Sequence, residues 1–319
     1  MTVALTQADR GPLRQVLSKG GIFLFLAALL VLGGIAQPVF LSAGNVSNML
    51  VQLAPLVIVV LGQTFVIISR GLDLSVASIM ATAAITPTLF PAGGNANGAI
   101  IAATLAVGLA AGVLNGVLVT KRNVSPFLAT LATAILLQGL RFAATAGAPS
   151  GNIPDLFKSL GTARLVGLPL SVWIAAGLAL LCAVLLHKST YGRQLYIVGG
   201  NPVAGELVGI RPDRVIILAY ILSGLLSALA GLMLAGFAGV VDNNIGRGFE
   251  LDSIVAAVIG GVALSGGRGG IAGAVAGAAI LVSIFTLVLL IGVPVQAQMI
   301  IKGVVILAAA AFYVRRTRF

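Results

Sequence analysis

Apolar residues occur along this chain in long blocks that are separated by short polar or basic turns. A helix that crosses a lipid bilayer needs about 20 mostly apolar residues, and most of the blocks approach this length. The pattern predicts ten spans, at 21–37, 49–69, 72–90, 99–120, 126–143, 168–186, 215–236, 249–264, 270–291 and 295–313. We therefore expect an all-α polytopic membrane protein, with a single transmembrane domain over 1–319 and a polar leader at 1–20.

The longest polar interruption, at 187–214, lies between the sixth and seventh predicted spans and reads HKSTYGRQLYIVGGNPVAGELVGIRPDR. Its pattern predicts short helices at 190–198 and 202–208, separated by a break at 199–201. This segment is long for a connection between two spans. It either docks a cytoplasmic partner or packs only against its own protein, and composition leaves both interpretations open.

Composition excludes a soluble protein. The chain is 59% hydrophobic, has a mean hydropathy of +1.13 and contains 8% charged residues, whereas a globular domain has about 25% charged residues. The net charge of +11 would suggest nucleic acid as a partner in a soluble protein. Here the basic residues lie in turns between apolar blocks, so we expect membrane lipid around the chain and no nucleic acid.

Lysine and arginine predict the orientation, because they accumulate on the cytoplasmic side of membrane proteins. With the N-terminus inside, most of the 19 basic residues fall in inner segments, and only Lys158, Arg164 and Arg247 fall in outer ones. This distribution predicts that both termini and the 187–214 loop are cytoplasmic. The outer segment at 144–167 is expected to carry a short surface helix at 154–160.

An internal repeat is suggested by two similar span beginnings. Residues 70–74 read RGLDL and residues 247–251 read RGFEL, five predicted spans apart. Each following span carries glycines at steps of four, at 108, 112 and 116 and at 269, 273 and 277. Because five is odd, the copies enter the membrane from opposite sides, which predicts an inverted repeat of spans 2–5 and 7–10. Coincidence among 41 glycines is the alternative. The stepped glycines permit close helix packing within one subunit, or at a subunit interface.

Two acidic residues are predicted to lie in the first turns of their helices. There, Asp73 and Glu250 would meet free N–H groups and the positive end of the helix dipole, which makes capping the simplest interpretation. The alternative is a gate or hinge, in which each acid faces an arginine, Arg70 or Arg247. Asp252 is close enough in sequence to join the outer pair.

Lys302 is predicted to lie about seven residues, or 10 Å, inside the tenth span. A charge at that depth is costly and is a candidate for function. Glu250 and Asp252 are its expected partners in an ion pair. A direct role in a transport path and snorkelling to the outer surface remain alternatives.

Uncharged polar residues within the predicted spans are candidates for a solute path. The candidates are Gln63, Ser75, Asn115, Thr130, Gln138 and Ser223. Amides and hydroxyls suit a neutral, hydroxyl-rich solute better than an ion, whose path would need carboxylates or rings of charge. The alternative is that these groups form hydrogen bonds between helices.

The residues needed for enzyme chemistry are scarce. The chain has one histidine and one cysteine, too few for most metal sites and catalytic dyads. It contains no Gly-Lys-Ser/Thr sequence, so it lacks a phosphate-binding loop. We expect no catalytic residue, no metal and no cofactor in this chain, and any ATP-driven function needs a second protein.

The 187–214 loop resembles the cytoplasmic coupling region of ribose-type ABC sugar permeases. The residues that carry this resemblance, and that are expected to contact an ATPase, are Tyr191, Gly192, Arg193, Gln194, Gly199, Gly200, Asn201 and Pro202. Other segments similar to the family are GLDLS at 71–75, PFLATL at 126–131 with Arg141, GFELD at 248–252, and the glycine-rich sequences at 259–261 and 266–269. The resemblance covers nearly all of the chain from Phe40 onward.

The resemblance implies a permease subunit in a bacterial inner membrane. The expected partners are a cytoplasmic ABC ATPase that holds ATP and Mg²⁺, an extracytoplasmic sugar-binding protein, and a second permease copy or a paralogue in a homodimer or heterodimer. Transport would proceed by alternating access, coupled to the ATPase through the 187–214 loop.

The family pattern is not matched everywhere. The sequence VSIFTLVLLIGV at 282–293 replaces a segment in which many members carry asparagines. This leaves deoxy or methyl sugars, polyols, or a partner that supplies the polar half of the path as alternatives to ribose. Permeases for nucleosides or branched-chain amino acids, and an ion-coupled secondary transporter, are the competing functions.

Overall fold

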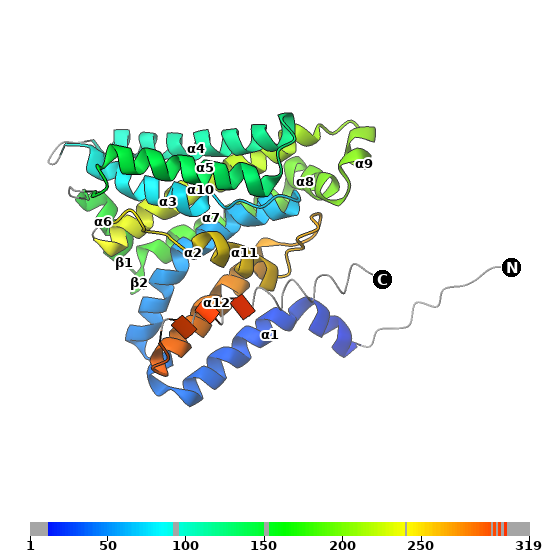
Figure 1. Cartoon of the computed structure of the whole chain (residues 1–319). Coiled ribbons are helices and arrows are strands. Elements are labelled where there is room, and N and C mark those ends of the chain that lie inside the picture. Colours follow the sequence, from blue (N-terminus) through cyan, green and yellow to red (C-terminus); the bar gives the residue numbers. More distant parts are fainter. Residues whose placement is uncertain are drawn as a thin grey trace.

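The computed structural model describes residues 12–91, 96–149, 153–239, 241–294, 296–297, 299–300 and 303–304, with side chains from residue 20 onward. Helices dominate the described chain (Figure 1). In chain order the elements are α1 (Pro12–Ala36), η1 (Pro38–Leu41), α2 (Ala43–Ile68), α3 (Val76–Ile85), η2 (Thr86–Leu89), α4 (Asn97–Lys121), α5 (Pro126–Ala144), α6 (Asp155–Thr162), β1 (Arg164–Leu165), β2 (Leu168–Pro169), α7 (Leu170–Lys188), α8 (Thr190–Gly200), α9 (Pro202–Leu207), α10 (Pro212–Ala238), α11 (Phe249–Ile259) and α12 (Ile271–Leu290).

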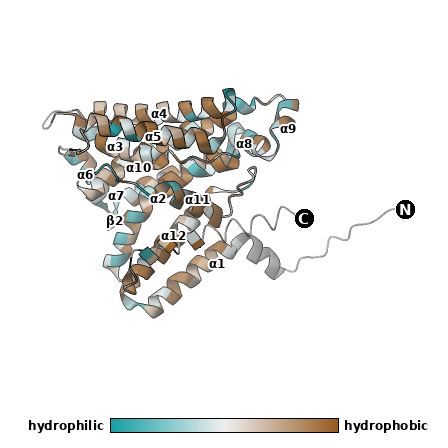
Figure 2. Cartoon of the chain, in the orientation of Figure 1, coloured by the Kyte–Doolittle hydropathy of each residue, from teal (hydrophilic) through white to brown (hydrophobic). Residues whose placement is uncertain are grey.

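Six described helices are long and apolar enough to cross a membrane: α2, α4, α5, α7, α10 and α12. Two shorter apolar helical segments, at 20–36 and 76–89, add to these. The helices are hydrophobic along most of their length (Figure 2). The chain is therefore an all-α multi-pass membrane protein. Among the described residues, the one sheet is the antiparallel hairpin β1–β2, whose strands have two residues each. Lys302 and most of the predicted span at 295–313 lie outside the described residues.

The predictions of continuous helices at 72–90 and 249–264 are wrong. Residues 71–75 are not helical, and α3 has 10 residues. A separate 3₁₀ turn, η2, begins at Thr86 with Pro87 as its second residue. The second segment ends at Ile259, where Gly260 and Gly261 follow and Gly261 takes a positive φ of 86°. Proline and glycine end these helices for different reasons. Proline has no main-chain N–H to donate, whereas glycine readily adopts left-handed backbone geometry.

The helix α10 lies at the centre of the fold, packed against α2, α3, α4 and α6 (Figure 1). The first stepped glycine row makes its contact with α4 possible. A Cβ atom on Gly108 would lie 2.4 Å from the carbonyl oxygen of Gly224, and one on Gly112 would lie 2.5 Å from that of Tyr220. Backbone touches backbone along this contact, which confirms close packing within one chain.

The second glycine row packs on a different helix. A Cβ atom on Gly273 would lie 2.1 Å from the oxygen of Gly260, and one on Gly277 would lie 2.0 Å from that of Ala256. Both contacts are with α11 or its end. Gly269 precedes α12 and has a φ of 139°. The two rows share their spacing and their tight packing, but they do not contact equivalent helices.

The two ends of the helical body differ. At one end, α6 lies within the 144–167 segment, close to the short helix predicted at 154–160. Its Phe157 is buried, while Gly161 packs against Phe237. The hairpin β1–β2 continues from it. At the other end lie α8 and α9 (Figure 1). The helix α1 diverges from the body and contacts α12 and η1.

Replacing Gly112 by leucine tests the contact between α4 and α10. We expect a less stable protein, because the side chain must displace main-chain atoms of α10, at a cost of about 1–3 kcal/mol. The thermal unfolding midpoint in detergent should fall by several degrees. Gly177→Leu on α7 is the matched control, since a Cβ atom there meets nothing within 4 Å. Equal midpoints for the two variants would contradict the packing described.

Candidate functional site

A cavity of about 470 Å³ lies between α3, α5, the 243–247 segment and the start of α11. This volume lies within the range of small-molecule pockets, about 300–1,000 Å³. The lining residues are Leu74, Ala77, Ser78, Ala81, Leu131, Ala134, Ile135, Gln138, Arg141, Asn243, Asn244, Ile245, Arg247, Glu250 and Leu251. The lining therefore combines hydrogen-bonding groups with apolar side chains.

Arg141 connects three walls of this cavity. It lies on α5 with 6% of its surface exposed. Its Nη2 donates to the main-chain oxygen of Asn243 at 3.0 Å, and its Nη1 donates to that of Ser78 at 3.3 Å. Asn243 in turn donates from Nδ2 to the oxygen of Gly147 at 2.9 Å. These bonds hold the 243–247 segment against α3 and α5 in the cavity wall.

Arg247 and Glu250 belong to the cavity lining. Gly248, with a φ of 100°, sets the left-handed turn before α11. The Glu250 carboxylate accepts from the Gly248 N–H at 2.8 Å, so this acid lies in the first helical turn as the sequence predicts. Asp252 lies in the same turn. A gate formed by these residues stays a prediction.

Asp73 occupies a different position from the predicted one. The helix α3 begins at Val76, so Asp73 precedes its first turn rather than lying in it. Its fully buried carboxylate accepts from the Ser75 N–H at 2.9 Å and hydroxyl at 2.5 Å, and from the Ser223 hydroxyl at 2.8 Å. The predicted pair with Arg70 is not formed, because the Arg70 guanidinium instead donates to main-chain oxygens of α8.

A polar network, which we call the Asp73 network, holds the 71–75 segment. Asn115 donates from Nδ2 to the Ser75 hydroxyl at 2.9 Å, and Thr130 Oγ1 accepts from the Leu74 N–H at 3.1 Å. The Gln63 amide lies opposite the main-chain N–H and C=O of Asp73, which it bonds at 3.3 and 3.2 Å in the orientation that satisfies both groups. Each contact fixes a segment that has no helical hydrogen bonds of its own.

The predicted solute-path residues therefore separate into two groups. Gln63, Ser75, Asn115, Thr130 and Ser223 are fully buried in the Asp73 network and do not line the cavity. Gln138 is the predicted path residue that does line it. Sequence polarity marked both groups equally, because it does not report which side of a helix faces a cavity.

The 187–214 loop folds as two helices, as predicted, but the break between them is shorter. Gly199 and Gly200 form the last turn of α8, and Asn201 alone separates it from α9. The Asn201 side chain accepts from the N–H groups of Val203 and Ala204 at 3.0 and 3.2 Å, and Pro202 is the first residue of α9. Asn201 is thus an N-cap, a common function of asparagine.

Two of the expected coupling residues fix the loop to the helices. Tyr191 stacks on Phe65 and donates its hydroxyl to the oxygen of Val215 at 3.2 Å. Burial raises the pKa of its phenol above the ordinary value, so it stays a neutral donor. Gly192 packs so closely that a Cβ atom would lie 1.9 Å from the oxygen of Leu186. Arg193 is exposed, while Gln194 is half-buried.

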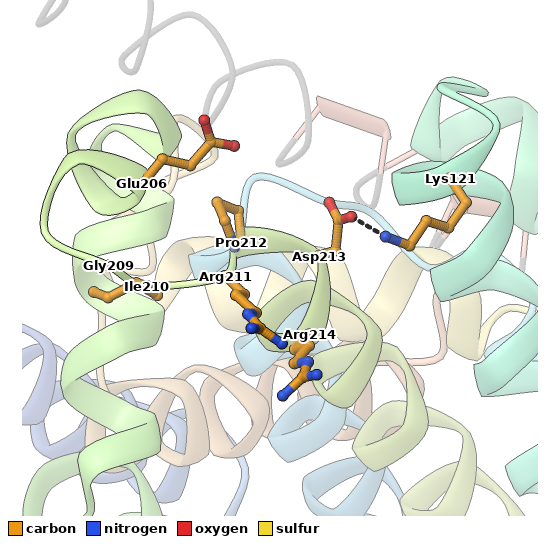
Figure 3. Close-up of a pocket in the computed structure, with 8 residues that line it drawn as sticks. All are labelled: Lys121, Glu206, Gly209, Ile210, Arg211, Pro212, Asp213 and Arg214. Atoms are coloured by element: carbon orange, nitrogen blue, oxygen red, sulfur yellow. Dashed lines mark hydrogen bonds and ion pairs between the residues drawn. The ribbon is translucent and has the colours of Figure 1, made fainter.

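The loop also exposes apolar side chains that sequence reasoning missed. Leu207 is 84% exposed, Val208 69% and Val203 65%, all on or next to α9. Exposed aliphatic residues on a polar loop commonly mark a protein interface. A groove of about 510 Å³ lies beside them, between α9, the start of α10 and the end of α4 (Figure 3). Lys121 and Asp213 form an ion pair across it.

Comparison with known proteins gives consistent matches. A family model described as a branched-chain amino acid transport system permease component matches residues 45–310. The ribose import permease RbsC of Bacillus subtilis is 39% identical over 307 residues, with 95% of each chain covered. The ribose import permease RbsC of Escherichia coli K12 is 40% identical over 292 residues, covering 89% of this chain and 91% of that protein.

A third relative, the galactose/methyl galactoside import permease MglC of Escherichia coli K12, is 34% identical over 317 residues, with 92% of this chain and 94% of that protein covered. No solved structure gives a significant match. The chain belongs to the ribose-type sugar permeases of ABC importers. This permease is accordingly a transporter subunit and not an enzyme with its own ATPase motif.

Replacing Asp73 by alanine tests the Asp73 network in the permease. We expect a loss of about 2 kcal/mol of stability, because Ser75 and Ser223 lose an acceptor in a buried site. Thermal unfolding in detergent measures the change in stability. Asp155→Ala is the matched control, since its side chain is 98% exposed and pairs with the partly exposed Lys158. A stable Asp73→Ala variant would contradict the role given to this carboxylate.

Proposed function

We propose that this permease is the membrane-spanning subunit of an ATP-driven importer of a monosaccharide or related polyol, located in a bacterial inner membrane. It exposes a central path to each side in turn, and a separate ATPase supplies the energy. The observation that carries the proposal is a cavity of sugar size with amide, hydroxyl and charged groups, in a chain whose relatives are named ribose and galactose import permeases.

The cavity chemistry supports a sugar as the solute. A pyranose or furanose presents hydroxyls at its edge and C–H groups on its faces. Gln138, Asn244 and Arg247 offer donors and acceptors, while Leu131 and Ile135 offer an apolar surface. The apolar segment at 282–293 belongs to α12 and its end, and it does not line this cavity. Its lack of asparagines therefore does not weaken the case for a polyhydroxylated solute.

A second permease copy or a paralogue completes the cavity. The helix α5 packs mainly on α3 and α4, so the described helices leave its other face uncovered. On that face, Ile135 lines the cavity and is 61% exposed, and Leu136 and Leu140 beside it are 51% and 57% exposed. Contact between two such faces would bury these apolar side chains and enclose the solute between the subunits.

Ten spans with both termini in the cytoplasm remain the topology that we propose. The packing of the described helices supports an inverted repeat. If α2, α3 and α4 correspond to α10, α11 and α12, then the contact of α4 with α10 corresponds to that of α12 with α2. The contact of α3 with α10 likewise corresponds to that of α11 with α2. Both pairs of contacts are present.

The 187–214 loop is the proposed docking site for the ATPase, which would hold ATP and Mg²⁺. The support is the exposed apolar surface of Val203, Leu207 and Val208 next to the charged groove of Figure 3. An extracytoplasmic sugar-binding protein would deliver the solute at the opposite end, where α6 and the hairpin lie. We infer these partners because the relatives are named as permeases of import systems.

Co-purification from native membranes tests the whole proposal. We expect an associated ATPase whose hydrolysis is stimulated by a binding protein loaded with a monosaccharide. Stimulation by a nucleoside or a branched-chain amino acid instead would favour the alternative solutes. Uptake into liposomes that is driven by an ion gradient without any ATPase would favour a secondary transporter and refute the proposal.

Replacing Gln138 by leucine tests the cavity as the solute site. The variant keeps a similar volume but loses the amide, so we expect at least about a tenfold loss of uptake. Hydrolysis by the associated ATPase should continue. Gln52→Leu is the control, because Gln52 lies on α2 outside the cavity lining. Uptake by Gln138→Leu at the level of the control would exclude this residue from the path.

Replacing Leu207 by aspartate tests the docking surface. We expect loss of most ATPase from the purified complex, since a charge would be buried in an apolar interface. Leu156→Asp on α6 is the control, because Leu156 is also exposed on a short helix but lies at the other end of the protein. Retention of the ATPase by the Leu207 variant would place the docking site elsewhere.

A further inference from the structure

Arg70 stands where a glycine is expected. The end of α2 is a Schellman turn, in which the N–H of Gly71 donates to the oxygen of Val66 at 2.9 Å and that of Arg70 to the oxygen of Ile67 at 2.9 Å. Arg70 takes the left-handed position of this turn, with a φ of 69°. Glycine is strongly favoured there, because a side chain costs about 1–2 kcal/mol in this conformation. We therefore expect the Arg70 side chain to make contacts that offset this cost.

The Arg70 side chain makes such contacts at the end of α8. Its Nε donates to the main-chain oxygen of Gly199 at 2.7 Å, and its Nη2 donates to that of Gly200 at 2.5 Å. These carbonyls belong to the last turn of α8, where no intrahelical partner exists and the helix dipole is negative. One guanidinium thus satisfies two free acceptors. It connects Arg70 to two glycines that follow it in the sequence by 129 and 130 positions.

A third segment completes this contact. We call residues 68–71, 196–201 and 266–269 the α2–α8 junction. The Gly267 N–H donates to the oxygen of Ile68 at 2.9 Å, and the Tyr196 hydroxyl donates to that of Gly269 at 2.7 Å. A Cβ atom on Gly199 would lie 1.8 Å from the oxygen of Ile68 and 2.7 Å from the nitrogen of Gly267. The three segments are packed too closely to slide past one another.

The α2–α8 junction continues directly into the cavity wall. Four residues after Arg70, Leu74 lines the cavity, and Ala77 and Ser78 follow on α3. The intervening Asp73 is held by Ser75 and Ser223. A displacement of α8 therefore reaches the cavity through a short, hydrogen-bonded segment rather than through flexible chain.

We propose that Arg70 is a positioning residue for transport, whose guanidinium fastens the end of α8 to the end of α2 so that movement of the docked loop displaces the 71–75 segment at the cavity. This assignment rests on the proposed function, because it requires an ATPase on the 187–214 loop. It differs from docking itself, since Arg70 bonds this chain's own carbonyls. Coupling energies of this kind correspond to about 5- to 150-fold effects.

The decisive variant is Arg70→Gly. Glycine suits the left-handed turn, so the fold and thermal midpoint should be retained or improved, while both bonds to α8 are lost. We expect the ATPase to co-purify as in the wild type and to hydrolyse ATP at a similar rate. Maximal sugar uptake should fall about tenfold, with an unchanged half-saturating concentration of loaded binding protein. The ATP consumed per sugar then rises by the same factor.

Asn123→Gly is the matched control. Asn123 also has a positive φ, 52°, follows the end of α4 and is exposed. It has no side-chain hydrogen bond among the described residues, so relief of its backbone strain should leave uptake unchanged. Arg70→Lys should restore part of the uptake, because the ammonium group can still reach one carbonyl. Arg70→Lys also tests the proposal if the Arg70→Gly variant does not insert into the membrane.

Three results separate the possible failures. Normal uptake by Arg70→Gly would overturn the proposal. Loss of the ATPase from the Arg70→Gly complex would overturn it as well, by making Arg70 part of the docking surface. A wild-type permease without any associated ATPase would refute the proposed function itself, and the role of Arg70 with it.

Discussion

Main-chain groups that leave helical geometry inside a membrane protein must find partners within the protein, because hydrocarbon offers none. The 71–75 segment meets this constraint through the Asp73 network. Gln63, Asn115, Thr130 and Ser223 reach it from α2, α4, α5 and α10, one polar side chain from each helix. Four helices are therefore held in register by the need to satisfy one non-helical segment, and the rest of the structure is arranged around it.

Close helix packing brings these side chains within reach. A Cβ atom on Gly62 would lie 2.7 Å from the Cα of Ser223, so α2 and α10 touch beside the network. Gly224, the next residue on α10, faces Gly108 of α4 at a similarly short distance. Small residues let the backbones approach, and the approach lets short hydroxyl and amide side chains bridge them. Packing and hydrogen bonding thus depend on each other at the same place.

The location of the Asp73 network gives it functional consequences. The cavity borders Leu74 and the start of α3, while the α2–α8 junction begins at the end of α2. A continuous helix from α2 into α3 would cross the membrane in one direction and could not connect these places. The non-helical segment reverses the chain and puts a stretch of a few residues between the surface proposed for an ATPase and the space proposed for a solute. Rigidity along this stretch follows from its buried hydrogen bonds.

The sequence alone determined the class of the protein, its long apolar helices, the two helices of the 187–214 loop and its family, because hydrophobic period and local motifs are properties of neighbouring residues. It did not determine which polar residues face a cavity. Gln138 and Asn115 have the same local signal, but α5 turns the first toward the cavity and α4 turns the second toward Ser75. Nor did it separate Arg70 from Asp73, which are close in sequence but bind different helices. Only tertiary structure decides such choices, since the partners lie up to 150 positions away.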